Sequence, residues 1–302
     1  MEMPLKVTAI ILTFNEQRNL PACIESIKDY VNEIIVVDSI STDETIEIAQ
    51  NYGCKTYQNK FINQAKQFIW ATENTEISNE WILRIDADER WTKEGFEELG
   101  KLISSDSYDG IYVKMKIYFM GRWIKRGGFY PNYFLRVYKK SRGRMEDRWM
   151  DEHIKVEGKT IISGIDVIEA NYDRQQNITL WTTKHNNYST REAVEFLIAK
   201  HNLNKLDSVA NLFGNKTERK RWLKEKFYFK VPLFVRPLLY YIHRYIFKFG
   251  FLDGKEGFIF HYLHAFWYRF LVDVKVYQLE SLSKKEKKSI SQIIKNHYDI
   301  DL

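Results

Sequence analysis

Three carboxylates, those of Asp86, Asp88 and Glu89, stand close together at the end of one buried stretch of the sequence. The segment Trp81–Asp86 reads WILRID, and the chain continues through Ala87 and Asp88 to Glu89. Alternate carboxylates at a strand end can present oxygen atoms to one hard divalent cation, Mg²⁺ or Mn²⁺, which takes its remaining ligands from substrate phosphate groups. A solvated acidic turn after the strand is the alternative interpretation of the same residues.

Two other buried segments also end in polar residues. The apolar run Val7–Phe14 leads into Asn15 and Glu16, so the motif reads TFNE, and Glu33–Asp38 (EIIVVD) leads into serine and threonine residues. An aspartate that closes a buried strand, such as Asp38, can accept hydrogen bonds from a base or a ribose. We therefore assign Asp38 mainly to function.

Part of this polar sequence has a structural explanation. Ser41 and Glu44 match a capping box for a following helix, so we assign Ser41–Glu44 mainly to structure. Asn15 could cap a helix. Glu16 could bind a ligand in the crevice or interact with a helix dipole.

A fourth motif, Met150-Asp151-Glu152-His153, places two acids beside a histidine. One of these carboxylates could act as a general base that removes a proton from a hydroxyl group. A surface turn is the alternative explanation of Asp151 and Glu152.

Alternating strand and helix patterns must position these residues. Apolar residues recur at helical spacing within Leu20–Val31, Thr45–Tyr52 and Ile62–Ala71, and Cys54–Gln58 forms a short strand between the last two. Alternation of this kind predicts parallel strands and right-handed crossovers. Ligands bind at the carboxyl ends of strands in such sheets, so the polar strand ends should converge on one crevice.

The pattern changes in the middle of the chain. The segments Ile111–Met120 and Tyr133–Tyr138 alternate as antiparallel or mixed strands do, and Arg122–Pro131 (RWIKRGGFYP) forms the loop between them. That loop could cover a bound substrate or be a mobile hairpin. After Asn177 the sequence is helical nearly to the end. We expect an α/β catalytic domain over residues 1–212 and a helical region over 213–302.

The composition excludes several classes of protein. The chain has 302 residues, of which 44% are apolar and 28% charged, as in an ordinary globular protein. Cys23 and Cys54 are too few for a disulfide framework or a zinc site of their own, so a reducing cytosolic setting is expected. No stretch approaches about 18 uncharged apolar residues, so we expect no transmembrane helix.

The positive charge is concentrated in one segment. Lys216–Lys248 carries ten Lys and Arg residues and two acids, while the whole chain has a net charge of +6. Basic and aromatic residues on amphipathic helices suit an anionic membrane surface. A helical subdomain with solvated charges is the alternative. We expect no nucleic-acid partner, because no nucleic-acid-binding motif accompanies this segment.

In combination, the motifs resemble glycosyltransferase family 2, whose inverting enzymes have the GT-A nucleotide-sugar-binding fold. TFNE, VDSxSxDxT, DADE and an acidic motif about 60 residues further on occur in the family's order, over roughly residues 5–200. The resemblance is nearest to the WaaE-like branch of lipopolysaccharide-core glucosyltransferases. This branch also has the pattern that runs from Trp181 through Lys184, His185 and Tyr188 to Glu192.

The resemblance implies a role for each motif. It places the nucleotide sugar at Thr13, Phe14, Glu16, Asp38, Lys66 and Asp86. The metal and the diphosphate would be held by Asp86 and Asp88. Either Asp151 or Glu152 would be the base, and the WaaE-like pattern favours Glu152.

The implied activity is the transfer of a sugar from a nucleotide-diphosphate donor, a UDP-sugar, with inversion at the anomeric carbon. The acceptor would be a hydroxyl of a lipid-linked glycan in lipopolysaccharide or other cell-envelope polysaccharide synthesis. Such a protein would be peripheral on the cytoplasmic face of the inner membrane. Two alternatives stay open, a polyprenyl-phosphate glycosyltransferase and a non-catalytic binding or scaffold protein on the same fold.

Overall fold

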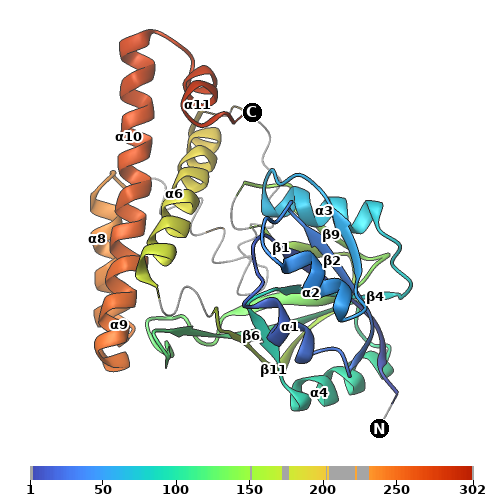
Figure 1. The fold of residues 1–302 in the computed structure, drawn as a ribbon. Helices are drawn as coiled ribbons and strands as arrows, with labels where there is room; N and C mark the ends of the chain where they lie inside the picture. Colours follow the sequence, from blue (N-terminus) through green and yellow to red (C-terminus); the bar gives the residue numbers. More distant parts are fainter. Residues whose placement is uncertain are drawn as a thin grey trace. The chain divides into compact units, whose positions relative to one another are not determined.

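The computed structural model describes residues 3–149, 152–171, 177–201, 203, 222 and 231–300. The chain forms two compact units (Figure 1). The first comprises Met1–Lys125, Phe129–Glu146 and Glu152–Asn177, and the second comprises Arg126–Gly128, Asp147–Asp151 and Ile178–Leu302. The division at 177/178 precedes the expected boundary at 212/213, which lies outside the described residues.

The first unit is built on a nine-stranded mixed sheet with the order β3-β2-β1-β4-β8-β6-β11-β5, in which β7 pairs with β6. Its strands are β1 (Leu5–Thr13), β2 (Val31–Asp38), β3 (Lys55–Gln58), β4 (Trp81–Asp86), β5 (Glu89–Trp91), β6 (Gly110–Phe119), β7 (Arg122–Trp123), β8 (Tyr133–Lys139) and β11 (Thr160–Glu169). A separate ribbon pairs β9 (Gly143–Met145) with β10 (Ile154–Val156). The helices are α1 (Leu20–Glu25), α2 (Thr45–Asn51), α3 (Gln64–Asn74) and α4 (Lys93–Ser104).

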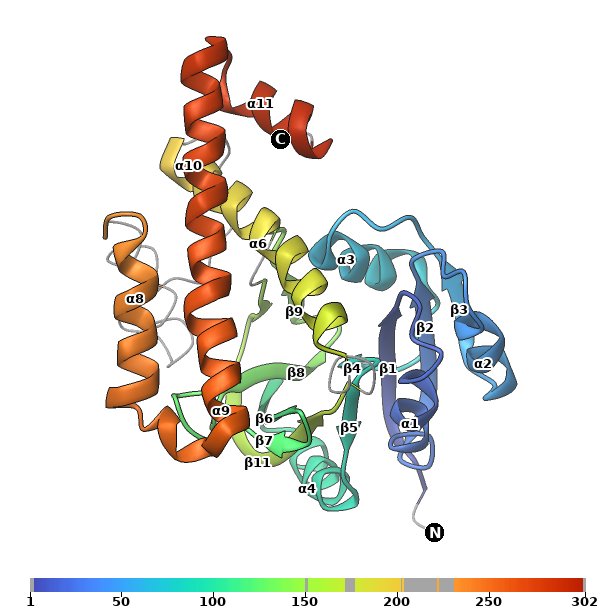
Figure 2. The ribbon, with the colours of Figure 1, turned by 60° about the vertical axis from the view of Figure 1, so that its left-hand side comes forward.

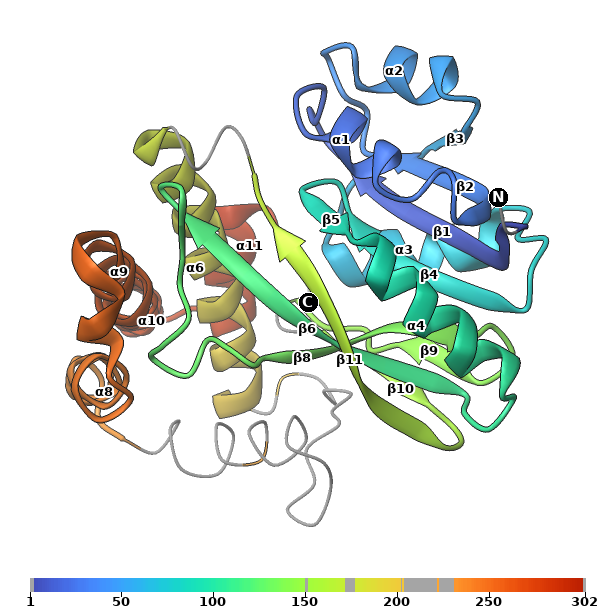
Figure 3. The same ribbon diagram turned by 90° about the horizontal axis from the view of Figure 1, so that it is seen from below.

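The expected parallel, Rossmann-like half is confirmed. Strands β3, β2, β1 and β4 are parallel neighbours, and the register places Thr13 beside Asp38 and Leu12 beside Asp86. The polar ends of three strands therefore meet at one edge of the sheet. The other half is mixed, because β8 is antiparallel to both β4 and β6, whereas β11 is parallel to β6 (Figure 3).

The order of the strands forces the sheet to curl. Four strand spacings separate β4 from β5, which would be roughly 19 Å in a flat sheet. Only Ala87 and Asp88 connect the two strands in sequence, and three Cα steps span at most about 11 Å. The sheet must bend until β5, the strand at one end, approaches the interior strand β4, and the DADE motif occupies the point where the two strands meet.

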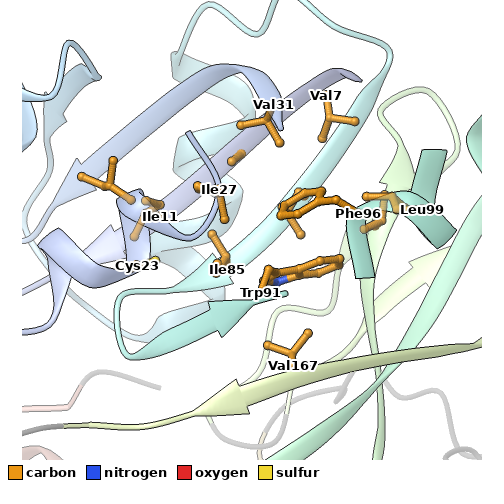
Figure 4. Packing of buried hydrophobic residues seen from close by; sticks show 14 of the residues in the cluster. Val7, Ile11, Cys23, Ile27, Val31, Ile85, Trp91, Phe96, Leu99 and Val167 are labelled. Carbon is orange, nitrogen blue, oxygen red and sulfur yellow. The ribbon is translucent and has the colours of Figure 1, made fainter. Parts of the chain in front are cut away.

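Buried apolar residues lie on both faces of the sheet. On one face, Ile11, Val31 and Ile85 pack with residues of α1 and α4, and the rings of Trp91 and Phe96 lie 5.2 Å apart (Figure 4). The other face packs against α3 and the ribbon of β9 and β10. These two layers hold the strand ends of the DADE region from both sides.

Two expectations for the helices were wrong. The helix expected over Leu20–Val31 ends at Glu25, because Val31 already pairs with Leu5 as the first residue of β2. The expected Ser41–Glu44 capping box does not form. The Ser41 hydroxyl donates to Asp38 instead, and Glu44 is the N-cap residue of α2 but its side chain makes no capping hydrogen bond.

The second unit is helical in its described part. It contains α6 (Ile178–His201), α8 (Val235–Ile242), α9 (Gly254–His261), α10 (Tyr268–Glu286) and α11 (Ile290–Tyr298). The π-helical turns η2 (His243–Phe247) and η4 (Tyr262–Trp267) and the 3₁₀ turn η3 (Gly250–Asp253) connect them. Figure 2 shows α8 and α10 side by side, joined at one end through η3 and α9. No helix in the described ranges is long and apolar enough to cross a membrane.

Buried ion pairs and an apolar core hold the second unit together. Leu197, Val272 and Ile293 belong to a core formed by α6, α10 and α11. The Arg236 Nε donates to the Asp273 carboxylate at 2.7 Å, and both side chains are at most 2% exposed. A buried ion pair fixes geometry strongly, because either charge left alone would be costly.

Part of the loop expected to be a cover or a mobile hairpin is anchored in this unit. The Arg126 amide donates to Asp253 at 2.7 Å, and Arg244 donates to the Gly127 carbonyl at 2.8 Å. Gly127 has a φ of +69°, and a Cβ atom there would lie 1.9 Å from the ring of His261. Only glycine fits this position, and these contacts anchor Arg126–Gly128. The two alternatives for the loop, a substrate cover and a mobile hairpin, stay predictions.

Glu33 connects four segments of the first unit. Its carboxylate accepts from Lys55 Nζ on β3 at 2.7 Å, from the Ser78 amide at 2.9 Å, and from Thr8 on β1. Burial raises the pKa of Glu33, but hydrogen bonds from Lys55, Thr8 and Ser78 outweigh this effect and lower the pKa to about 2. The folded state therefore favours the ionised carboxylate.

We expect Glu33→Gln to lower the free energy of unfolding by about 1–2 kcal/mol at pH 7, measured by urea denaturation. The carboxylate stabilises the fold fully above pH 4.5 and loses its contribution as the pH falls toward 2, so the difference from the wild type should shrink in that window. Glu73→Gln, at an exposed position on α3, is the control. A difference that stays constant down to pH 2 would contradict this account.

Candidate active site

The loops that follow β1 and β2 are linked to each other. The Asn15 amide donates to the Ser41 hydroxyl at 2.8 Å, and the Thr42 amide donates to the Asn15 side chain at 2.9 Å. Asn15 has a φ of +53°, so it does not cap the helix, and the N-cap residue of α1 is Asn19. Both loops are thus held as one rim over the carboxyl ends of the strands.

Asp38 lies beneath this rim. Thr13 donates its hydroxyl proton to Asp38 at 2.8 Å, and the Ser41 amide and hydroxyl donate to it at 2.7 and 2.5 Å. The Asp38 side chain is fully buried, so in this structure it orders the loops. A direct contact between Asp38 and a nucleoside stays a prediction.

The other residues predicted to bind the nucleotide, Phe14, Glu16 and Lys66, differ in solvent exposure and in hydrogen bonding. Glu16 is half-buried, accepts from the Asn19 side chain at 2.7 Å, and donates its amide to Thr45 at 2.8 Å. Phe14 is 57% exposed, which leaves its ring available for stacking. Lys66 is exposed near the start of α3, and its amide donates to Asn63, the N-cap residue. Roles for Phe14, Glu16 and Lys66 in nucleotide binding stay predictions.

A cluster of charged side chains forms where the curled sheet brings β4 and β5 together. Arg136 on β8 donates to Asp86 at the end of β4, at 3.2 Å, and to Glu89 at the start of β5. Arg136 is 6% exposed and Glu89 is 2% exposed. One buried guanidinium thus connects the two strands that the curl brings together.

The charges in this cluster influence each other. Burial raises the pKa of Glu89, and the positive charge of Arg136 opposes that rise. Burial alone would lower the pKa of Arg136, but Glu89 and Asp86 outweigh this effect and raise it above the usual range. Arg136 stays charged, while Glu89 binds a proton more readily than an exposed glutamate.

Asp88 is held separately. It is 7% exposed, its carboxylate accepts from Asn171 at 3.3 Å, and its carbonyl accepts from the Ala170 amide at 2.9 Å. Its orientation depends on the end of β11. The Asp86 side chain is more open at 30% exposed, and it accepts from Gln64 of α3 at 3.5 Å.

The candidate base joins this cluster through a second arginine. Arg84 Nη2 lies 3.1 Å from a carboxylate oxygen of Glu152, and Arg84 Nε lies 4.0 Å from Asp86. The Arg84 and Glu152 side chains are 9% and 11% exposed. Glu152 and Asp86 therefore belong to the same polar cluster, although 66 positions separate them in the sequence. Asp151, the other candidate base, lies outside the described residues.

The carboxylates of this cluster can be compared with the ligands that the expected divalent cation requires. Among the described residues, no group of three or more His, Cys, Asp and Glu side chains could hold a metal ion. Asp86 and Asp88 nevertheless fit the chemistry of Mg²⁺ or Mn²⁺, which needs only one or two protein carboxylates when substrate phosphates supply other oxygens. A cation bound at Asp86 would share that carboxylate with Arg136.

Sequence reasoning missed the two arginines. Arg84 interrupts the apolar strand WILRID, and Arg136 interrupts YFLRVYK in the same way. A charged residue within a buried strand needs a buried partner, and this signal was available in the sequence. The partners themselves were not, because Glu89 and Glu152 are brought close only by the curled sheet.

The comparison with known families agrees with this architecture. The sequence model of glycosyl transferase family 2 matches residues 8–157, which include most of β1, all elements from α1 to β10 and the DADE motif. Residues 8–157, just under half of the chain, therefore match glycosyl transferase family 2, and the expected α/β GT-A class with a C-terminal helical segment is confirmed.

Curated relatives include proteins of both unknown and named function. An uncharacterized glycosyltransferase of Rickettsia bellii is 35% identical over 138 residues, or 45% of this chain and 46% of that protein. The lipopolysaccharide core biosynthesis glycosyltransferase LpsC of Rhizobium meliloti is 32% identical over 148 residues, or 47% of this chain and 54% of that protein. The chain thus spans about half the length of these relatives.

One solved structure with local similarity is glucosyl-3-phosphoglycerate synthase from Mycobacterium tuberculosis, in complex with Mn²⁺, UDP-glucose and phosphoglyceric acid. It is 21% identical, and the match covers 37% of this chain and 43% of that one with a TM-score of 0.31.

We expect Arg136→Gln to lower the free energy of unfolding by about 3–5 kcal/mol, because it leaves the buried Glu89 carboxyl group without its charged partner. Adding Glu89→Gln should recover part of this loss, so the two effects should be far from additive in urea denaturation. Arg142→Gln, an exposed position in the turn after β8, should change stability by less than about 0.5 kcal/mol. Additive losses at positions 136 and 89 would show that the two residues do not act as a pair.

Proposed function

We propose that this protein is an inverting glycosyltransferase that moves a sugar from a nucleotide-diphosphate donor, a UDP-sugar, to a hydroxyl group of a glycan acceptor. The observation that carries the proposal is the link from Asp86 through Arg84 to Glu152. It places a carboxylate suited to a metal-bound diphosphate and a carboxylate suited to accept a proton in one polar cluster.

Each part of the cluster would have a distinct task. Asp86 and Asp88 would hold Mg²⁺ or Mn²⁺, and the bound cation would neutralise the charge that develops on the leaving diphosphate. Glu152 would take the proton from the attacking hydroxyl, and Arg84 would keep its carboxylate oriented. Attack on the side opposite the leaving nucleotide would invert the anomeric carbon. The rim of Asn15 and Ser41 would lie beside the nucleoside.

The acceptor is the more specific part of the proposal. We infer a lipid-linked glycan of lipopolysaccharide or another cell-envelope polysaccharide, and a peripheral location on the cytoplasmic face of the inner membrane. The similarity to LpsC, named for lipopolysaccharide core biosynthesis, supports this choice.

Calorimetric titration should detect UDP binding that is stronger with Mn²⁺ than without it, and stronger than GDP binding. Asp88→Ala should remove the metal-dependent part, because it deletes one of two carboxylates suited to hard cations. Glu94→Ala, at an exposed position on α4 outside the four motifs, is the control. If neither nucleotide binds, the non-catalytic alternative becomes the better explanation.

Glu152→Gln should reduce sugar transfer by about 10²–10⁴-fold and leave UDP binding unchanged, because the amide cannot accept the proton. Transfer is measured as UDP release that depends on an acceptor extract from cell envelopes. Glu157→Gln, at an exposed site beyond β10, should keep full activity. Full activity of Glu152→Gln would remove Glu152 from the role of base and would favour an acceptor that is already anionic, as in polyprenyl-phosphate transfer.

A further inference from the structure

The second unit exposes a concentrated group of large apolar side chains. We name residues 246–252, which run from the end of η2 into η3, the apolar tip. Its five large apolar residues are all substantially exposed. The exposed fractions are 50% for Ile246, 67% for Phe247, 58% for Phe249, 44% for Phe251 and 49% for Leu252. Large apolar patches on a protein surface mark contact sites for a partner or a membrane.

The apolar tip continues onto α8. Val235, Leu238 and Leu239 are between 46% and 53% exposed, and their spacing places them on one face of this helix. They belong to the same continuous run of α8 and η2 that ends at the tip (Figure 2). This helical run therefore has an exposed apolar face that extends over several turns.

The tip also continues onto α9. Tyr245 bridges the two elements, because its ring centroid lies 6.3 Å from that of Phe251 and 5.8 Å from that of Phe258. Phe258 and Tyr262, one turn apart, are 48% and 44% exposed. The apolar side chains thus form a surface that extends from α8 across the tip to α9 and η4.

The exposed charge around the tip is mainly positive. Lys248 lies within the tip and Lys255 follows it, and both are exposed. Of the two acids between positions 246 and 262, Asp253 is 2% exposed and bonded to Arg126, while Glu256 is half-buried. Aromatic and aliphatic side chains flanked by lysines match the boundary between anionic lipid headgroups and acyl chains.

The backbone of the tip is held in an unusual conformation. Phe249 has a φ of +58°, a left-handed conformation that is unfavourable for a bulky residue. The Lys248 carbonyl beside it accepts from the Gly127 amide at 3.0 Å, and a Cβ atom on Gly250 would lie 2.6 Å from the ring of His261. The packing beneath the tip therefore imposes a strained backbone on an exposed aromatic residue, and strain of this kind tends to occur at functional sites.

We propose that the apolar tip inserts into the headgroup and acyl boundary of an anionic lipid bilayer. Phe247, Phe249 and Phe251 enter the apolar layer, while Lys248 and Lys255 bind the lipid phosphates. The inference uses only the surface of the second unit and does not depend on the transfer reaction. Membrane binding can therefore be tested without nucleotide, metal or acceptor.

The test is co-sedimentation of the full chain with vesicles of phosphatidylcholine containing 30% phosphatidylglycerol, compared with phosphatidylcholine alone. We expect preferential binding to the anionic vesicles and release by high salt. The variant F247S/F249S should lose at least about tenfold in partitioning, because two aromatic anchors are removed. The variant K248E/K255E should lose binding mainly to anionic vesicles, by more than about fivefold for each position.

Matched controls separate insertion from other effects of the changes. Ile162→Ser alters an exposed apolar residue of the first unit, 51% exposed, and should bind vesicles like the wild type. Thermal unfolding by circular dichroism should be unchanged in the tip variants, because these side chains are exposed. Equal binding by F247S/F249S and the wild type would overturn the proposal. So would the absence of vesicle binding together with a dimer in solution that F247S/F249S converts to a monomer, since the tip would then bind a second copy of the chain.

Discussion

The arrangement of the first unit depends on the contact of the Arg136 guanidinium with Asp86 and Glu89. The two-residue link between β4 and β5 forces the sheet to curl, and the curl concentrates carboxylates of which Asp88 and Glu89 are buried. Acidic groups placed this closely would repel one another at low dielectric. Arg136, a residue of strand β8, offsets that repulsion. The same ion pairs therefore stabilise both the curled sheet and the candidate site.

The curl of the sheet also explains why the polar groups form one cluster. Arg84 lies two positions before Asp86 on β4, so both side chains project from the same face of the sheet. Glu152 reaches that face from the segment just before β10 and contacts Arg84. The proposed proton acceptor is therefore oriented by a residue of the strand that also carries the proposed metal ligand. A movement of β4 would affect both functions at once.

The sequence was most informative where its signals were local. The apolar runs of β1, β2 and β4 and their polar ends were predictable, because parallel strands align their carboxyl ends at one edge. The length of α1 and the role of Ser41 were not, because both depend on tertiary contacts: Val31 joins the sheet, and Asp38 takes the Ser41 hydroxyl. The partners of Arg84 and Arg136 also could not be predicted. Their contacts arise from strand order, which periodicity does not specify.

The second unit shows a different relation between sequence and surface. Its buried positions follow ordinary rules, since Arg236 is neutralised by Asp273 and the apolar residues of α6 and α10 pack together. The tip departs from those rules, because Phe249 is both exposed and left-handed, and the contacts of Gly127 and Gly250 beneath it are too close for any larger residue. A fold that needed only stability would place a small or polar residue at position 249. The ring of Phe249 lies 6.2 Å from that of Phe251. Its exposed remainder supports the proposed contact of the tip with an apolar environment.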